Sequence, residues 1–334
     1  MAAGGLSAAA VRGASGAQGL AADAASGATI GVAAGAATRW PGRTLDRADW
    51  AAPWFAAVAD DARRIDWSRP GATLDALDAL AAARGVATAG GRPVRFVDAR
   101  AVRAPAYEGH VSATGQVPTR PAGDGGVHDA LAALVWLALP RAKAALNALQ
   151  AERIERDGVG ARRGALRDEA TLFDENALVL AFDARCAVAR GAIEALRARD
   201  WAGALVARRA AWGASIRPIA FGHALMQKLL APYAATTAHA WPLALPADWF
   251  GPPPAARPTG PAPSAQRAGL ARLDAALADA LPALLSKRDA RLPLPVLGVP
   301  GWWPPNERAA FYDDAGIFRP AARRAAPGIT ERVT

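Results

Sequence analysis

Apolar residues recur every three or four positions along most of the chain, which is the period of an amphipathic helix. The clearest stripe comprises Leu131, Leu134, Val135 and Leu139, and the same period resumes after Pro140. Proline fits the first turn of a helix, where its missing N–H leaves no hydrogen bond unmade. The pattern therefore predicts two helices that meet at an angle at Pro140.

Shorter stretches repeat the helical period, and glycine or proline marks several of their ends. Each predicts one further helix or a short pair of helices. These predicted helices are 46–65; a short one around 74–80 that ends at Gly85; a short one after the loop 157–164; 184–212 in two pieces; 222–230; and 270–281, which Pro282 ends or kinks.

Extended chain is predicted where apolar residues are consecutive, or alternate with polar ones, in a segment bounded by turn-forming residues. Residues 177–182 form a wholly apolar run, which is typical of a buried strand. Strands or extended chain are also predicted at 94–97, 106–120 and 236–245. Together these elements predict a mainly helical α+β fold with one small mixed sheet and an irregular C-terminal segment rich in proline and tryptophan.

The first 38 residues differ in composition from the rest. They are mostly Ala, Gly, Ser and Thr, and only Arg12 and Asp23 are charged. A secretory signal would show a basic start and then a compact Leu-rich stretch, and this segment has neither. We expect a disordered tail over 1–38 and then a single globular domain over 40–330, with a Pro-rich linker at 251–263.

The chain carries a formal net charge of +9, which raises the question of a nucleic-acid partner. Lysine occurs only at Lys143, Lys228 and Lys287, so nearly all of the basic charge is arginine. The arginines are scattered singly and in pairs, without a basic run or interleaved aromatic residues. Since a GC-rich genome also produces this composition, a nucleic-acid partner remains an alternative hypothesis that basicity alone does not favour.

Cysteine usage and apolar run length exclude several classes of protein. Cys186 is the only cysteine, so neither an internal disulfide nor a cysteine-based zinc site can form. A lone cysteine suits a reducing compartment, and we expect a cytoplasmic location. No apolar run reaches the roughly 20 residues of a membrane helix, so we expect no membrane partner.

Several short motifs occur in a fixed order, and in combination they are more specific than any one of them. In order and spacing the chain resembles the bacterial family known as domain of unknown function 3025, over residues 45–320. The resemblance implies a bacterial source and one shared fold, with no known activity, cofactor or catalytic residue. The motifs are Gly115–Arg120, His128-Asp129, Ala133–Leu137 with Pro140, Lys143 and Asn147, Thr171–Asn176, Phe221–Leu225, Pro295–Trp303 with Asn306, and Phe311–Asp314.

Three histidines are candidate ligands for a divalent metal such as zinc. His128 and Asp129 are predicted at the start of one helix, His223 at the start of another, and His239 in extended chain. If these segments converge, they can offer imidazole nitrogens, a carboxylate and an open coordination position. The hypothesis requires the nitrogens of at least two of these histidines within about 5 Å of each other.

The alternative for these residues is a structural role. His128 and His223 both fall on apolar helix stripes, where a histidine commonly belongs to the core and has both nitrogens hydrogen-bonded. Asp129 is expected in a first helical turn, where a carboxylate stabilises the positive end of a helix.

The acidic pair Asp174-Glu175 precedes the buried strand and is a candidate acid–base pair or magnesium site. The alternative is a solvated turn, because Asp and Asn both favour turns. Asp129, Asp174 and Glu175 are therefore the candidate catalytic residues.

No phosphate loop, dinucleotide fingerprint or nucleophile elbow is present to identify an activity. Three hypotheses for the function follow from the residues. The first is a binding or scaffold module; the second is a metal-dependent hydrolase that uses His128, Asp129, His223 and His239; the third is a nucleic-acid-associated basic protein. Whether the protein is an enzyme, and which ligand it binds, is left open by the sequence.

Overall fold

The computed structural model describes residues 45–104, 106–120, 123–158, 164–251 and 263–321. The predicted tail at 1–38, and the predicted linker apart from its first and last residues, lie outside these ranges. The α-helices are α1 (Ala59–Ala62), α2 (Pro70–Arg84), α3 (Tyr107–Thr114), α4 (Gly123–Ala138), α5 (Pro140–Asp157), α6 (Ala165–Asn176), α7 (Ala187–Arg197), α8 (His223–Leu229) and α9 (Pro263–Leu285). The strands are β1 (Arg95–Asp98), β2 (Gln116–Thr119), β3 (Ala177–Asp183), β4 (Ile216–Ala220), β5 (Thr237–Leu245) and β6 (Leu292–Pro295).

A four-stranded mixed sheet with the order β4-β3-β5-β6 forms the centre of the fold. β3 runs parallel to β5 and antiparallel to β4, while β6 runs antiparallel to β5. Ala177 to Ala181 of β3 are fully buried, as the apolar run predicts for a strand covered on both faces. The mainly helical α+β class is therefore confirmed, and a parallel pair, β1-β2, adds a second small sheet.

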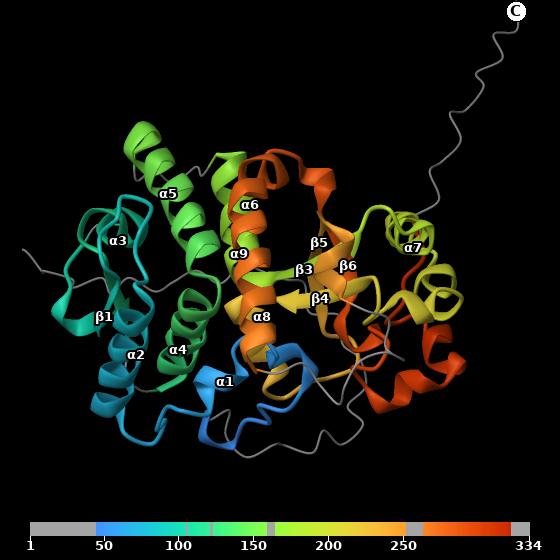
Figure 1. Ribbon diagram of the computed structural model, residues 1–334, viewed down its shortest axis with the longest axis horizontal. Coiled ribbons are helices and arrows are strands. Elements are labelled where there is room, and N and C mark those ends of the chain that lie inside the picture. The colour runs from blue at the N-terminus through green and yellow to red at the C-terminus, as the bar shows by residue number, and fades with distance from the viewer. Residues whose placement is uncertain (1–44, 105, 121–122, 159–163, 252–262, 322–334) are drawn as a thin grey trace, which may run out of the picture. The chain divides into compact units, whose positions relative to one another are not determined.

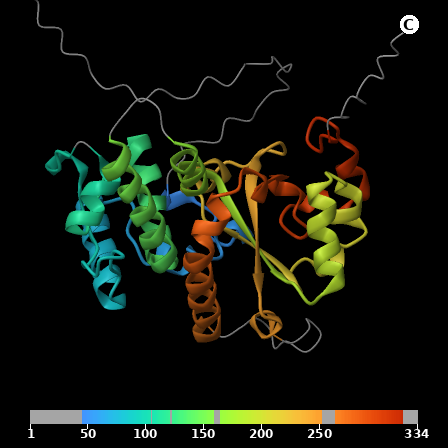
Figure 2. The same cartoon turned by 90° about the horizontal axis from the view of Figure 1, so that it is seen from above.

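Helices cover the sheet unevenly on its two sides. α9 packs along α5 and also contacts β5, so it lies between α5 and the sheet (Figure 1). α2 to α5 gather with β1 and β2 beyond α9, whereas α7 and the C-terminal segment after β6 lie at the opposite side of the sheet (Figure 2). One hydrophobic core joins these elements. Among the described residues no helix is long and apolar enough to span a membrane.

Two predicted segments differ from the structure. Residues 46–65 form 3₁₀ turns and the short α1 instead of one helix, because Pro53 inside such a helix would lose a hydrogen bond and clash with the preceding turn. Trp50, Trp54, Val58 and Ile65 of this stretch are buried nonetheless. The extended chain predicted for 106–120 is half helical: α3 ends at Gly115, whose φ of +75° suits glycine, and β2 follows.

Pro140 begins α5, as the pattern predicts, and a side chain from another helix caps this start. The carboxylate of Asp274 in α9 accepts hydrogen bonds from the backbone N–H of Arg141 at 3.0 Å and of Ala142 at 2.8 Å. Asp274 is buried, so these bonds replace the water that the first N–H groups of a helix otherwise need. The cap fixes α5 against α9.

A close backbone approach joins the end of β4 to the start of β3. The N–H groups of Phe221 and Gly222 both donate to the carbonyl of Ala177, at 3.0 and 2.9 Å. A Cβ on Gly222 would lie only 2.5 Å from Ala177 N and Glu175 O. Only glycine fits this approach, which places His223, the next residue, beside the end of α6.

Replacing Asp274 with alanine should lower the free energy of unfolding by about 1–2 kcal/mol, because α5 loses its cap. Urea unfolding followed by circular dichroism measures this change. Asp279→Ala, at an exposed position of the same helix, is the matched control and should leave the midpoint nearly unchanged. Equal midpoints for the two variants would contradict the capping role.

Gly222→Ala should destabilise the fold by about 1–3 kcal/mol, since the added methyl group forces two backbone segments apart. Gly269→Ala in α9 is the control, because nothing lies within 4 Å of its added Cβ. That variant should be neutral or slightly stabilising, as alanine favours a helix over glycine. Thermal unfolding of both variants tests the contrast, and a stable Gly222→Ala protein would refute it.

Candidate metal centre

Three potential ligands converge where α4, α6 and α8 meet. His128 comes from α4, Glu175 from the last turn of α6 and His223 from the first turn of α8. The two histidine Nε2 atoms are 2.9 Å apart. Glu175 Oε1 lies 3.7 Å from Nε2 of His223 and 3.9 Å from Nε2 of His128. The requirement of two histidine nitrogens within about 5 Å is met by the first two histidines.

These three separations have the size that one shared metal ion requires. A circle through atoms 2.9, 3.7 and 3.9 Å apart has a radius of about 2.1 Å. Zinc binds histidine nitrogen and carboxylate oxygen at about 2.0–2.2 Å. An ion near the plane of the three atoms would therefore contact all three at ordinary bond lengths.

The neighbours of each imidazole favour a proton on Nδ1, which leaves the lone pair on Nε2, the nitrogen that faces Glu175. His128 Nδ1 lies 3.1 Å from Gln227 Oε1, which can only accept, so Nδ1 carries the proton and Nε2 the lone pair. Nδ1 of His223 is buried, lies 3.9 Å from Asp174 Oδ1 and has no hydrogen-bond partner among the described residues. The adjacent carboxylate favours a proton on that nitrogen too, which leaves Nε2 as the ligand atom.

Burial keeps His223 in the neutral form that binds metals. Desolvation lowers its pKa to about 4, and the nearby charges of Lys143 and His128 act in the same direction. The carboxylate and backbone of Asp174 oppose this shift without outweighing it. The Nε2 atoms of the two histidines, which are within hydrogen-bonding distance, and an oxygen of Glu175 thus face one another.

The pKa values of the two carboxyl groups at the end of α6, Asp174 and Glu175, shift in opposite directions. Burial, followed by the charge of Asp174, raises the pKa of Glu175. Burial would also raise the pKa of Asp174, but the Lys143 ammonium and the two imidazoles outweigh it and hold that pKa below its ordinary value. Lys143 Nζ donates to Asp174 Oδ1 at 2.6 Å and is itself buried. Asp174 and Lys143 therefore form a buried ion pair beside His223.

Solvent reaches one side of the cluster. The side chain of Glu175 is 35% exposed and that of His128 is 28% exposed, whereas His223 is 6% exposed. A small molecule can therefore approach His128 and Glu175 directly, while His223 anchors the cluster in the interior.

Two of the sequence candidates lie outside this group. Asp129 accepts hydrogen bonds from the backbone N–H, Nε and Nη2 of Arg120, at 2.7–2.8 Å. Because α4 begins at Gly123, Asp129 lies in its second turn instead of at the predicted helix start. His239 Nδ1 lies 3.4 Å from Nη1 of Arg291, which also donates to Glu169. The metal-type group found among the described residues contains neither Asp129 nor His239.

Sequence reasoning missed Gln227 and Lys143 as parts of the site. Gln227 follows His223 by four residues, so both lie on one face of α8, and this spacing could have indicated a joint role. Lys143 follows Pro140 by three residues and is one of only three lysines, which was the available signal for it. Neither signal identifies the partner residue, because Gln227 and Lys143 contact residues that are distant from them in the sequence.

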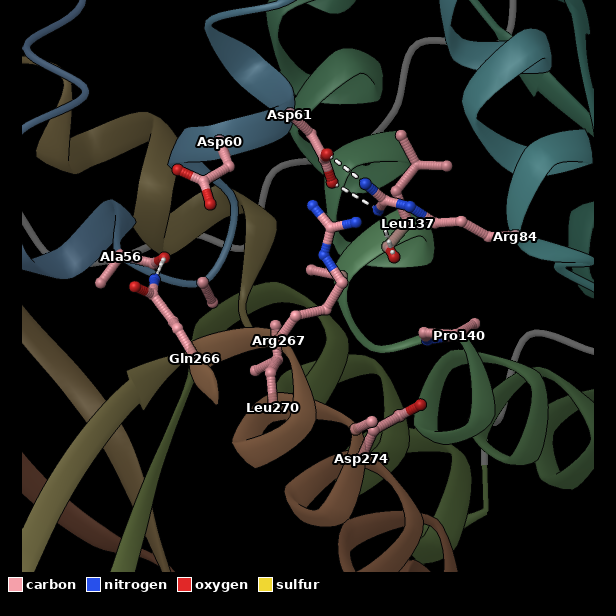
Figure 3. A pocket seen from close by; sticks show the side chains of 13 residues that line it. Ala56, Asp60, Asp61, Arg84, Leu137, Pro140, Gln266, Arg267, Leu270 and Asp274 are labelled. Carbon is pink, nitrogen blue, oxygen red and sulfur yellow. Dashed lines mark hydrogen bonds and ion pairs between the residues drawn. The ribbon is translucent and has the colours of Figure 1, made fainter. Parts of the chain in front are cut away.

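A pocket of about 170 Å³ lies elsewhere, against α9 (Figure 3). Several of its polar side chains are already engaged: Asp61 forms an ion pair with Arg84, and Asp274 caps α5. Gln266 donates to the carbonyl of Ala56 at 3.3 Å. None of the three converging ligands lines this pocket, so it does not compete with the centre as a site of chemistry.

Comparison with known proteins connects the chain to one family. No curated protein and no solved structure matches it. The family described as Protein of unknown function (DUF3025) matches residues 94–323, a range that contains His128, Glu175 and His223. This match covers more than half of the chain and confirms the resemblance found in the motifs. The chain therefore belongs to the DUF3025 family.

Proposed function

We propose that this protein is a hydrolase with a single zinc ion bound by His128, Glu175 and His223. The observation that carries the proposal is the convergence of two oriented imidazole lone pairs and a carboxylate oxygen at 2.9–3.9 Å from one another. Two histidines and a glutamate form a known catalytic zinc set in which water takes the fourth position.

The spacing of the ligand atoms favours a zinc site over an octahedral iron site. Tetrahedral ligands at about 2.05 Å are about 3.3 Å apart, whereas adjacent ligands of an octahedral ion are about 2.9 Å apart at that bond length. The two histidine nitrogens match the octahedral value, but both separations to Glu175 are wider, at 3.7 and 3.9 Å. The mean of the three separations, about 3.5 Å, is nearer to the tetrahedral value, and on this basis zinc is the proposed ion.

A zinc ion at this position would supply a nucleophile at neutral pH. Bound zinc lowers the pKa of its water to about 7 and polarises the bond under attack. The exposed sides of His128 and Glu175 leave room for that water and for substrate. Hydrolysis of an ester, amide or phosphoester bond is the reaction class that such a centre performs without a redox cofactor.

The surrounding residues of the chain have supporting roles in this proposal. Gln227 holds His128 in the tautomer and orientation that present Nε2. Asp174, 3.9 Å from Nδ1 of His223, favours a proton on that nitrogen through its charge, and Lys143 pairs with Asp174. Outer-shell partners of this kind typically contribute 10- to 100-fold to metal affinity.

The alternatives fit the cluster less well. A binding or scaffold module has no need for two imidazoles and two carboxylates in one partly buried group, because desolvating such groups costs several kcal/mol unless they are paired. The nucleic-acid hypothesis is based on net charge and stays a prediction. The arrangement of the ligands therefore favours the hydrolase.

Zinc binding tests the ligand set directly. Protein stripped with a chelator should take up one zinc ion per chain in isothermal titration calorimetry, and elemental analysis should return the same ratio. His128→Ala and His223→Ala should each reduce the affinity by more than about 100-fold, which exceeds the effect of outer-shell changes. His239→Ala is the matched control and should bind zinc as the natural protein does. Equal losses in all three variants, or no zinc uptake at all, would refute the centre.

Hydrolysis should depend on the bound ion. We expect zinc-loaded protein to cleave at least one member of a panel of nitrophenyl carboxylates and phosphate esters, and chelation followed by zinc addition should remove and restore that activity. Glu175→Gln should lower kcat/KM strongly, since a neutral amide is a poorer zinc ligand than a carboxylate. Cleavage that is indifferent to both the chelator and this substitution would mean that the centre is not catalytic.

A further inference from the structure

Lysine is rare in this protein, yet two of its three lysines lie beside the centre. Lysine and arginine together number 39, and of these only Lys143, Lys228 and Lys287 are lysines. Lys143 pairs with Asp174, and Lys228 lies on α8 next to Gln227. An ammonium group is a compact point charge with freely rotating donors, unlike the planar fork of arginine. The charges of both lysines act on Glu175.

Lys228 differs from Lys143 in having a neutral partner. Its Nζ donates to Asn176 Oδ1 at 3.1 Å, and Asn176 directly follows Glu175. The side chain is exposed, and no ion pair with a carboxylate is found for it among the residues described. An ammonium has three donors, and the amide oxygen uses one of them. Lys228 therefore keeps an exposed positive charge that acts on Glu175, and it has donors that Asn176 does not use.

The positive charge of Lys228 affects the pKa values of His239 and Glu175. Burial is the main cause of the lowered pKa of His239 and of the raised pKa of Glu175; the charge of Lys228 adds slightly to the first shift and slightly opposes the second. With zinc bound, Glu175 offsets half of the ion's charge, and Lys143 offsets Asp174. Lys228 then adds a further positive charge, so the loaded centre attracts anions.

We infer that the substrate carries an oxyanion, a carboxylate or a phosphate group, which binds Lys228 while the bond to be cleaved lies at the zinc ion. This inference rests on the proposed zinc centre. Asn176 acts as the positioning residue, because its amide oxygen holds the ammonium one residue away from the ligand Glu175. A charge-assisted hydrogen bond from Lys228 would fix the orientation of the substrate.

Hydroxamates with and without an anionic tail test the inference on zinc-loaded protein. The hydroxamate group binds the ion, and the tail explores the surface around it. The anionic probes are the monohydroxamates of succinic, glutaric and adipic acid and their phosphonate analogues, and the neutral probes are alkyl hydroxamates of matching length. Calorimetry at low and at high salt gives the affinity of each probe.

The natural protein should bind the best anionic probe about three- to tenfold more tightly than its neutral match, and salt should reduce this preference. Lys228→Met should abolish the preference for anionic probes. Its affinity for the neutral probes and for zinc should stay unchanged. Lys287→Met, at another exposed lysine, should keep the preference. The carboxylate and phosphonate series show which oxyanion is favoured.

The outcomes separate the two proposals. Absence of zinc uptake would refute the zinc centre itself, and absence of any hydroxamate binding to zinc-loaded protein would refute its open coordination position. Equal binding of anionic and neutral probes to the natural protein would overturn the inference and leave the zinc centre standing. A preference for anionic probes that survives in Lys228→Met would also overturn the inference and leave the zinc centre standing. Lys228 would then only stabilise the last turn of α8.

Discussion

The candidate site depends on one backbone contact, in which the carbonyl of Ala177 accepts hydrogen bonds from Phe221 and Gly222. This carbonyl lies at the first residue of the buried central strand, immediately after α6. The two bonds hold the end of β4 against the end of α6, so the first residue of α8 lies beside the last turn of α6. His223 and Glu175, 48 positions apart in the sequence, meet because of this contact. A side chain at position 222 would prevent the approach.

Three consecutive residues at the end of α6 each contact a different part of the site. Asp174 pairs with Lys143 of α5, Glu175 faces both imidazoles, and Asn176 accepts a hydrogen bond from Lys228 of α8. Successive residues of a helix point in directions about 100° apart, which allows them to reach different neighbours. The end of one helix thus organises groups from three others.

The donor atoms of the cluster are of the types that bind a divalent cation. Two imidazole nitrogens and a carboxylate oxygen lie within 2.9–3.9 Å of one another, and the buried Nδ1 of His223 lacks a hydrogen bond within the described residues. Burying such groups together is unfavourable unless an ion binds them. Zinc binding to these groups would stabilise the fold, because the unfolded chain does not hold the three ligands together.

The sequence by itself determined the class of fold, the helix break at Pro140, the buried strand at 177–182 and membership of the family, because these depend on local periodicity and on short motifs. It also identified His128, His223 and the acidic pair before β3 as candidate residues. It could not show that Glu175 joins the two histidines while Asp129 pairs with Arg120 and His239 lies beside Arg291. The packing of α4, α6 and α8 around the Ala177–Gly222 contact brings Glu175 to the two histidines, whereas His239 meets Arg291 beside the β5–β6 pair. Long-range packing of this kind leaves no periodic trace in the sequence, so only the tertiary structure decided which side chains share the site.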